Sequence, residues 1–159
     1  MIEISAHSGI YTLESSQLLP LKLDQAWDFF SSPKNLATIT PSHMGFHITS
    51  TNVDRMHVGQ IITYKIGLVP GIKTNWVTEI THVKEGHYFV DEQRFGPYAM
   101  WHHEHWFEET NEGVMMYDRV SYKLPLGYFG RLAQPLISKK LKEVFSYRTK
   151  VIAEIFSEK

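Results

Sequence analysis

Six stretches between residues 45 and 124 alternate apolar and polar side chains with a period of two, and short turn-like segments separate them. Side chains alternate across a β-strand, so this period is typical of strands that bury one face. The separators contain Gly, Pro or Asn, which permit the backbone angles of a hairpin. With a further run at residues 10–19, we predict about seven strands in one antiparallel sheet. The six runs are residues 45–52, 60–68, 72–83, 87–95, 98–109 and 113–124.

Two other segments have helical periodicity. Residues 20–41, between the first predicted strand and the second, favour two short helices, of which the second begins at Pro33 and ends before Pro41. From residue 129 to residue 156, apolar side chains recur at spacings of three and four, which predicts a long amphipathic C-terminal helix. An antiparallel sheet must cover its apolar face. We therefore predict an α+β fold in which the curved sheet wraps around this helix.

The composition excludes several classes of protein. A chain of 159 residues without linker or repeat is expected to form a single domain, residues 1–159. The net charge of -1 disfavours nucleic acid as a partner. Because Cys is absent, the chain cannot form a disulfide scaffold, a thiolate nucleophile or a thiolate metal site. The N-terminal residues lack the pattern of a signal peptide, and no apolar run reaches about 18 residues. We expect a cytoplasmic protein.

Four local patterns accompany this order of elements: FFSSPKNLATITP at residues 29–41, GI.TNW.TEI at 71–80, FVDEQ..GPY..W.HEH.FE at 89–108 and FSYR at 145–148. Together they resemble the START-like (SRPBCC) superfamily of the helix-grip fold, close to the branch called polyketide cyclase/dehydrase-like or cell-division-inhibitor-like. The resemblance implies a START-like ligand-binding domain with a hollow between the sheet and the C-terminal helix. Relatives hold lipids, sterols, polyketides, quinones or plant hormones there. No catalytic residue is carried over.

The run YAMWHHEHWFEE at residues 98–109 combines aromatic and titratable side chains on both faces. Trp101, His103, His105 and Phe107 share one face, a mixture typical of a pocket wall. On the neighbouring strands, the informative positions are those whose polar atoms need partners once they are buried. The predicted ligand-binding residues are Tyr64, Trp76, Thr78, Trp101, His103, His105, Asp118 and Tyr122.

The same histidines raise the question of a metal site. His103 and His105, at positions i and i+2 of a strand, can converge on one ion. A third ligand would have to come from Asp91, Glu92 or Asp118 on a neighbouring strand. Because this ligand spacing is incomplete, we favour hydrogen-bonded wall histidines, and we assign no metal ligand and no cofactor.

Binding or transport of a small hydrophobic or amphipathic ligand is the function that these patterns favour. The alternative is a polyketide cyclase/dehydrase-like or hydrolase-like enzyme that uses a cavity His with a carboxylate such as Asp118. The chain has no recognisable nucleophile or cofactor motif, so we expect a binding protein and assign no catalytic residue.

A third class is a protein-interaction module that uses the face of Trp106 and a basic helix. Between residues 131 and 150, six basic side chains accompany one acidic side chain, Glu143. This face suits transient contact with an anionic membrane or a protein partner. We also expect the GLVPG segment at residues 67–71 to be a hairpin turn that gates the cavity.

Overall fold

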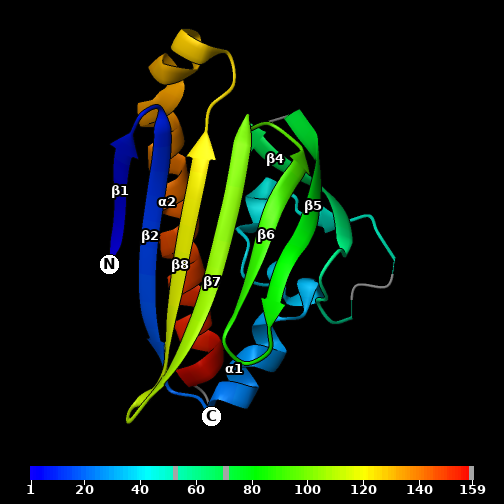
Figure 1. Cartoon of the computed structure of the whole chain (residues 1–159), viewed down its shortest axis with the longest axis vertical. Coiled ribbons are helices and arrows are strands. Elements are labelled where there is room, and N and C mark those ends of the chain that lie inside the picture. Colours follow the sequence, from blue (N-terminus) through cyan, green and yellow to red (C-terminus); the bar gives the residue numbers. More distant parts are fainter. Residues whose placement is uncertain (52–53, 70–71, 158–159) are drawn as a thin grey trace.

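The computed structural model describes residues 1–51, 54–69 and 72–157. In these residues eight strands form one antiparallel sheet with the order β1-β2-β8-β7-β6-β5-β4-β3 (Figure 1). The strands are β1 (Ile2–His7), β2 (Ile10–Leu19), β3 (His47–Ile48), β4 (Ile61–Val69), β5 (Ile72–Lys84), β6 (Tyr88–Phe95), β7 (Met100–Thr110) and β8 (Gly113–Lys123).

The strand count corrects the prediction of about seven. The additional strand, β1, pairs with β2 across a tight turn in which Ser8 and Gly9 have φ of 53° and 80°. Most of its side chains are exposed because it is an edge strand, so it lacks a strong apolar alternation. At the other edge β3 has only two residues, whereas the predicted run covers residues 45–52, of which Asn52 lies outside the described residues.

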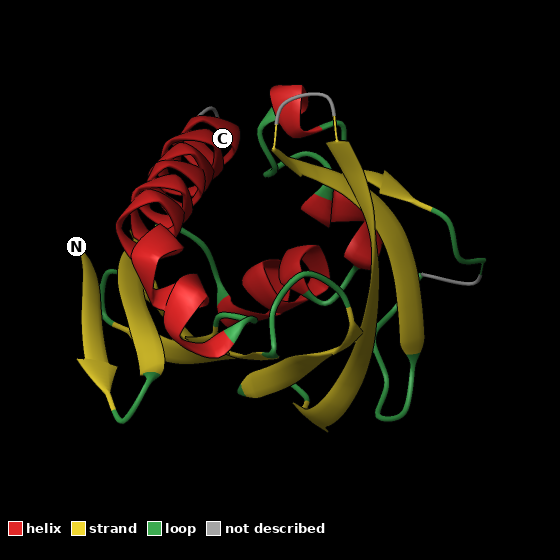
Figure 2. Ribbon diagram, turned by 90° about the horizontal axis from the view of Figure 1, so that it is seen from above, coloured by secondary structure: helices red, strands yellow, loops and turns green. Residues whose placement is uncertain are grey.

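The short helices do not lie between the first and second strands of the sheet. The predicted first strand is β2, because β1 was not predicted, so the helices follow the second strand. They are α1 (Leu23–Phe30), the 3₁₀-helix η1 (Pro33–Leu36) and the 3₁₀-helix η2 (Ser42–Met44). Seen from above, the sheet curves around these helices and around the C-terminal helix α2 (Gly127–Ser157) (Figure 2). Trp27 of α1 packs edge-to-face on Phe89 of β6 and Phe107 of β7, which fixes α1 against the sheet.

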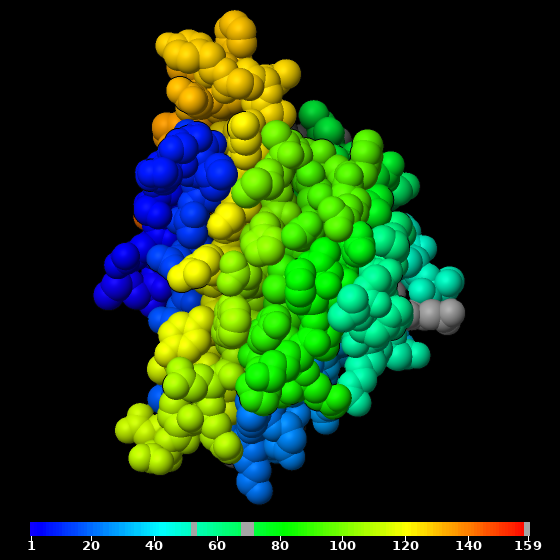
Figure 3. Space-filling model, viewed as in Figure 1, coloured from blue at the N-terminus to red at the C-terminus, as the bar shows by residue number. Residues whose placement is uncertain are grey.

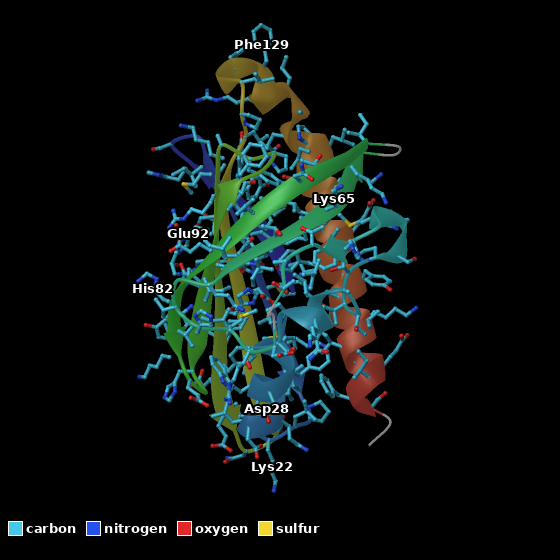
Figure 4. All side chains as sticks on the ribbon, turned by 90° about the vertical axis from the view of Figure 1, so that its right-hand side faces the viewer. Lys22, Asp28, Lys65, His82, Glu92 and Phe129 are labelled. Carbon is cyan, nitrogen blue, oxygen red and sulfur yellow. The ribbon has the colours of Figure 1, made fainter. Side chains whose placement is uncertain are left out.

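Helix α2 covers the concave face of the sheet only along part of its length. Leu141, Phe145, Ile152 and Phe156 are buried. The beginning of α2 extends past the sheet at one end of the molecule (Figure 3). Phe129 lies at this tip and is 74% exposed (Figure 4). Other exposed apolar side chains there are Leu126, Tyr128, Leu132 and Leu136. Apolar periodicity predicts the helix but not the point at which the sheet ends beneath it. Pro135 lies inside α2.

The predicted inward faces of β4, β5, β7 and β8 are confirmed by burial. Strand pairing then sets which inward residues are neighbours: His103 of β7 lies opposite Asp91 of β6, and His105 lies opposite Asp118 of β8. The side on which Asp91 points was ambiguous in the sequence. The register between β5 and β6 shifts between Ile80 and His82, so the simple alternation is interrupted beside Asp91.

Candidate functional site

A cavity of about 230 Å³ lies between the concave face of the sheet and α2. Its lining comes from the short helices, from β4 to β8 and from α2. Most of it is apolar or aromatic, and the polar side chains that reach it include Asp91, His103, His105 and Arg148. Such a lining is typical of a small-molecule site, although the volume is below the range of about 300–1,000 Å³ that is common for ligand pockets. The space suits a compact ligand.

Five of the eight predicted ligand-binding residues line this cavity: Tyr64, Trp76, Trp101, His103 and His105. The other three are not among the lining residues. They are Thr78, whose hydroxyl is 3.2 Å from the Tyr64 hydroxyl, Tyr122, whose hydroxyl is 3.2 Å from Ser138 Oγ, and Asp118, which contacts the two histidines.

The aromatic part of the wall is a connected set of rings. The Trp76 ring stacks on Tyr64 with the centroids 5.8 Å apart, and Trp101 meets Trp76 edge-on at 5.3 Å. The Trp101 ring in turn contacts His103 at 6.2 Å. Because these rings hold one another, their positions are fixed before a ligand enters.

Asp91, His103, His105 and Asp118 form a closed cluster in the wall, which we call the His–Asp cluster. His103 Nε2 is hydrogen-bonded to Asp118 Oδ1 at 3.0 Å, and His105 Nε2 to Asp91 Oδ2 at 3.0 Å. His103 Nδ1 lies 3.4 Å from Asp91 Oδ2. His105 Nδ1 lies 2.9 Å from Asp118 Oδ1, without the angle of a hydrogen bond. Each imidazole therefore lies between two carboxylates.

Burial and these contacts oppose each other in setting the pKa of each group. Burial alone would raise the pKa of Asp118, but the hydrogen bond from His103 and the proximity of His105 hold it far below its usual range. The pKa of Asp91 is lowered in the same way. Burial and the neighbouring His105 lower the pKa of His103. For His105, the two carboxylates outweigh burial, and its pKa is raised. The two histidines thus differ in their affinity for protons.

Two buried N–H groups in the cavity wall have no hydrogen-bond acceptor among the described residues: Trp76 Nε1 and Arg148 Nε. The Arg148 guanidinium lies over the Phe145 ring, 4.9 Å from its centroid. Its positive charge acts on both Asp91 and Tyr64, whose own pKa is raised mainly by burial. The wall therefore presents a cation and two donor atoms without acceptors.

Arg148 and Asp91 are two charged residues of the cavity wall that the predicted ligand-binding set does not include; the sequence named Asp91 only as a possible metal ligand. The basic residues between positions 131 and 150 include Arg148, which the structure places at the cavity and not on the outer face of the helix. The signal was its position at i+7 from Leu141, in line with Phe145 and Ile152, which put a charge in the apolar stripe. Lys139, Lys142 and Lys150 are exposed, as expected for an outer face.

The predicted interaction face around Trp106 lies on the outer surface. Its ring is 43% exposed, stacks on Tyr88 with the centroids 4.4 Å apart, and donates from Nε1 to Glu104 at 3.0 Å. The predicted gate includes Pro70 and Gly71, which lie outside the described residues. Within the described part of the chain, no helix combines the length and hydrophobicity needed to cross a membrane.

No family model matches this chain, and no curated protein matches it in sequence. Among solved structures, it is similar to Ms6760 from Mycobacterium smegmatis, with 15% identity, a TM-score of 0.70 and 99% of each chain covered. CV1439 from Chromobacterium violaceum matches at 14% identity and a TM-score of 0.69, over 91% of this chain and 96% of that one. Ara h 8.0201 matches at 13% identity and a TM-score of 0.59, over 92% and 99%. With the curved sheet and the long C-terminal helix, these likenesses fit a helix-grip fold.

Proposed function

We propose that residues 1–159 form a ligand-binding domain that encloses a small amphipathic molecule between the sheet and α2. Folds of this kind commonly bind hydrophobic ligands. The observation that carries the proposal is the preformed cavity, whose wall is largely apolar yet contains the donors Trp76 Nε1 and Arg148 Nε without acceptors. An apolar ligand body with one polar end is complementary to both features.

The energetics favour a polar end that carries oxygen acceptors. A buried donor without a partner costs about 1–3 kcal/mol, and a ligand acceptor recovers that free energy. Apolar ligand surface contributes about 25 cal/mol for each Å² removed from water. Because Arg148 is a permanent cation in a wall of low polarity, a carboxylate or another oxyanion fits better than a hydroxyl. We therefore expect the ligand to be an amphipathic acid.

A matched pair of ligands tests this. 2-Naphthoate and 2-naphthylmethanol have the same compact aromatic body and differ in the charge of the polar end. Calorimetric titration is expected to show tighter binding of 2-naphthoate. Arg148→Gln is expected to weaken that binding about 10- to 150-fold, the equivalent of about 1.5–3 kcal/mol for a hydrogen bond to a charged group. The binding of 2-naphthylmethanol should hardly change.

Lys150→Gln is the matched control, because Lys150 is on the same helix and its side chain is 76% exposed. It removes the same charge and should leave both affinities unchanged. Equal affinity for the acid and the alcohol, unaffected by Arg148→Gln, would refute the acidic ligand while leaving enclosure intact. Failure of the folded protein to bind either compound would contradict enclosure of a compact aromatic ligand.

Acid–base catalysis is the second candidate function, and the His–Asp cluster favours it. His103 and His105 both line the cavity, and their pKa values are displaced in opposite directions. A cyclase or hydrolase would use one ring as a base and the other as an acid. If the cluster is catalytic, His103→Gln should lower kcat for a substrate of the protein and leave the affinity for that substrate unchanged. Loss of affinity alone supports the binding role.

A further inference from the structure

Asp91, His103 and His105 have the arrangement of metal ligands. One donor atom of each lies within 4.8 Å of the donor atoms of the other two. Asp91 Oδ2 is 3.0 Å from His105 Nε2 and 3.4 Å from His103 Nδ1. In a tetrahedral zinc site with ligand distances of about 2.1 Å, two ligand atoms lie about 3.4 Å apart. The two distances that include Asp91 are therefore close to the spacing that one ion would impose, and the two histidine donor atoms lie within 4.8 Å of each other.

Asp118 supplies the support that metal-binding histidines normally have. Its Oδ1 atom lies 3.0 Å from His103 Nε2 and 2.9 Å from His105 Nδ1, the ring atoms that do not face Asp91. A carboxylate behind a histidine fixes the orientation of the ring and makes its other nitrogen a better ligand. Asp118 does this for His103 through a hydrogen bond, and it lies beside His105 Nδ1 without the angle of one.

We propose that Asp91, His103 and His105 bind one divalent transition-metal ion of the zinc type, with its remaining coordination position facing the cavity. Two imidazole nitrogens and one carboxylate oxygen suit Zn²⁺ and its first-row neighbours, whereas Mg²⁺ and Ca²⁺ prefer oxygen ligands alone. Three protein ligands with an open position are typical of sites that act on a bound molecule. All three side chains line the cavity, so the ion has a route to them.

Binding of the ion replaces the hydrogen bond between His105 Nε2 and Asp91 Oδ2, which are 3.0 Å apart. The ligating imidazole nitrogen and carboxylate oxygen must both be free of protons, so any proton on these atoms moves to the other ring nitrogen or to solvent. The two carboxylates of the cluster offset the charge of the ion in the buried wall.

The test starts from protein freed of any affinity tag and of metal by chelation. Calorimetric titration with ZnCl₂ is expected to show one ion bound per chain. Loss of a carboxylate that only supports a metal ligand typically weakens metal binding about 10- to 100-fold. Asp91→Asn and His105→Asn each remove a ligand, so each should weaken Zn²⁺ binding by more than this. Circular dichroism shows whether each variant is folded.

His102→Asn is the matched control. His102 is on the same strand but on the opposite face, and it also lies between two carboxylates, 2.9 Å from Glu92 and 3.4 Å from Glu104. Glu92 lies on the side of the sheet away from α2 (Figure 4). This variant should bind Zn²⁺ like the wild-type protein. Zinc binding that is lost in His102→Asn but kept in His105→Asn would place the ion on the outer surface and overturn the proposal.

A measurement on the wild-type protein covers the case in which a variant does not fold. Loaded with one equivalent of Cu²⁺, the protein should show hyperfine coupling to two imidazole nitrogens in its electron paramagnetic resonance spectrum. Coupling to none or one, or the absence of stoichiometric Zn²⁺ binding, overturns the site. The metal site goes beyond the proposed ligand binding. The metal-free protein can be titrated with 2-naphthoate in a separate experiment, so each proposal can fail without the other.

Discussion

Replacing Asp118 by Asn is expected to destabilise the fold far more than its conservative size suggests. The side chain keeps its volume but loses its charge, and it is 8% exposed. In the native protein its Oδ1 atom faces the nearest nitrogens of His103 and His105 at 3.0 and 2.9 Å. The amide leaves the positive charge that the cluster favours on His105 with Asp91 as its remaining carboxylate partner.

The expected magnitude follows from this burial. Removing one partner of a buried ion pair costs about 3–5 kcal/mol, because the other charge stays in a medium that solvates it poorly. For a domain of this size, the loss corresponds to a decrease in Tm of about 6–20 °C. Urea denaturation of the chelator-treated protein, followed by circular dichroism, measures the free energy of unfolding directly.

Glu14→Gln is the matched control for Asp118→Asn. Glu14 Oε1 lies 2.9 Å from Arg119 Nη2, the same distance as in the buried cluster, but the two side chains are 53% and 54% exposed. An exposed pair contributes about 0–1 kcal/mol, so this variant should be nearly as stable as the wild-type protein. If the two variants lose similar amounts of stability, the cluster is not stabilised as a buried charge network and the reasoning is wrong.

Two further predictions concern stability. Burial raises the pKa of the Tyr98 hydroxyl above its ordinary value of about 10, so the stability that depends on its neutral form is complete below about pH 10 and is lost as the pH rises further. Tyr98→Phe should therefore reduce the alkaline loss of stability by up to about 1.4 kcal/mol per pH unit in urea denaturation, and an unchanged pH profile would contradict this. Ile152→Ala, at a position 1% exposed on the buried face of α2, should cost about 2–5 kcal/mol, whereas Leu132→Ala, 68% exposed near the beginning of the same helix, should change the free energy of unfolding by no more than about 0.5 kcal/mol. Similar values for the two would show that α2 is not anchored through Ile152.

The strand pattern predicted most of the sheet and the inward faces on which the site depends. Trp76 and His103 were assigned to a cavity wall because period-two alternation fixes which side chains share a face. The edges were harder to predict. The apolar alternation of β1 is weak because most of its side chains are exposed. In the described part of the run at 45–52, regular strand pairing with β4 is confined to residues 47–48, and Thr49 and Ser50 add hydrogen bonds to the Thr63 carbonyl.

The sequence by itself determined an α+β fold with a long C-terminal helix and a sheet whose inner face mixes aromatic and titratable groups. This follows because apolar periodicity is a local property of the chain. Only the tertiary structure decided that Asp91 and Asp118 flank the two histidines and that Arg148 enters the cavity from α2. Those contacts depend on strand register, on the interruption beside Ile80 and on the rotation of a helix, each of which is set by long-range packing.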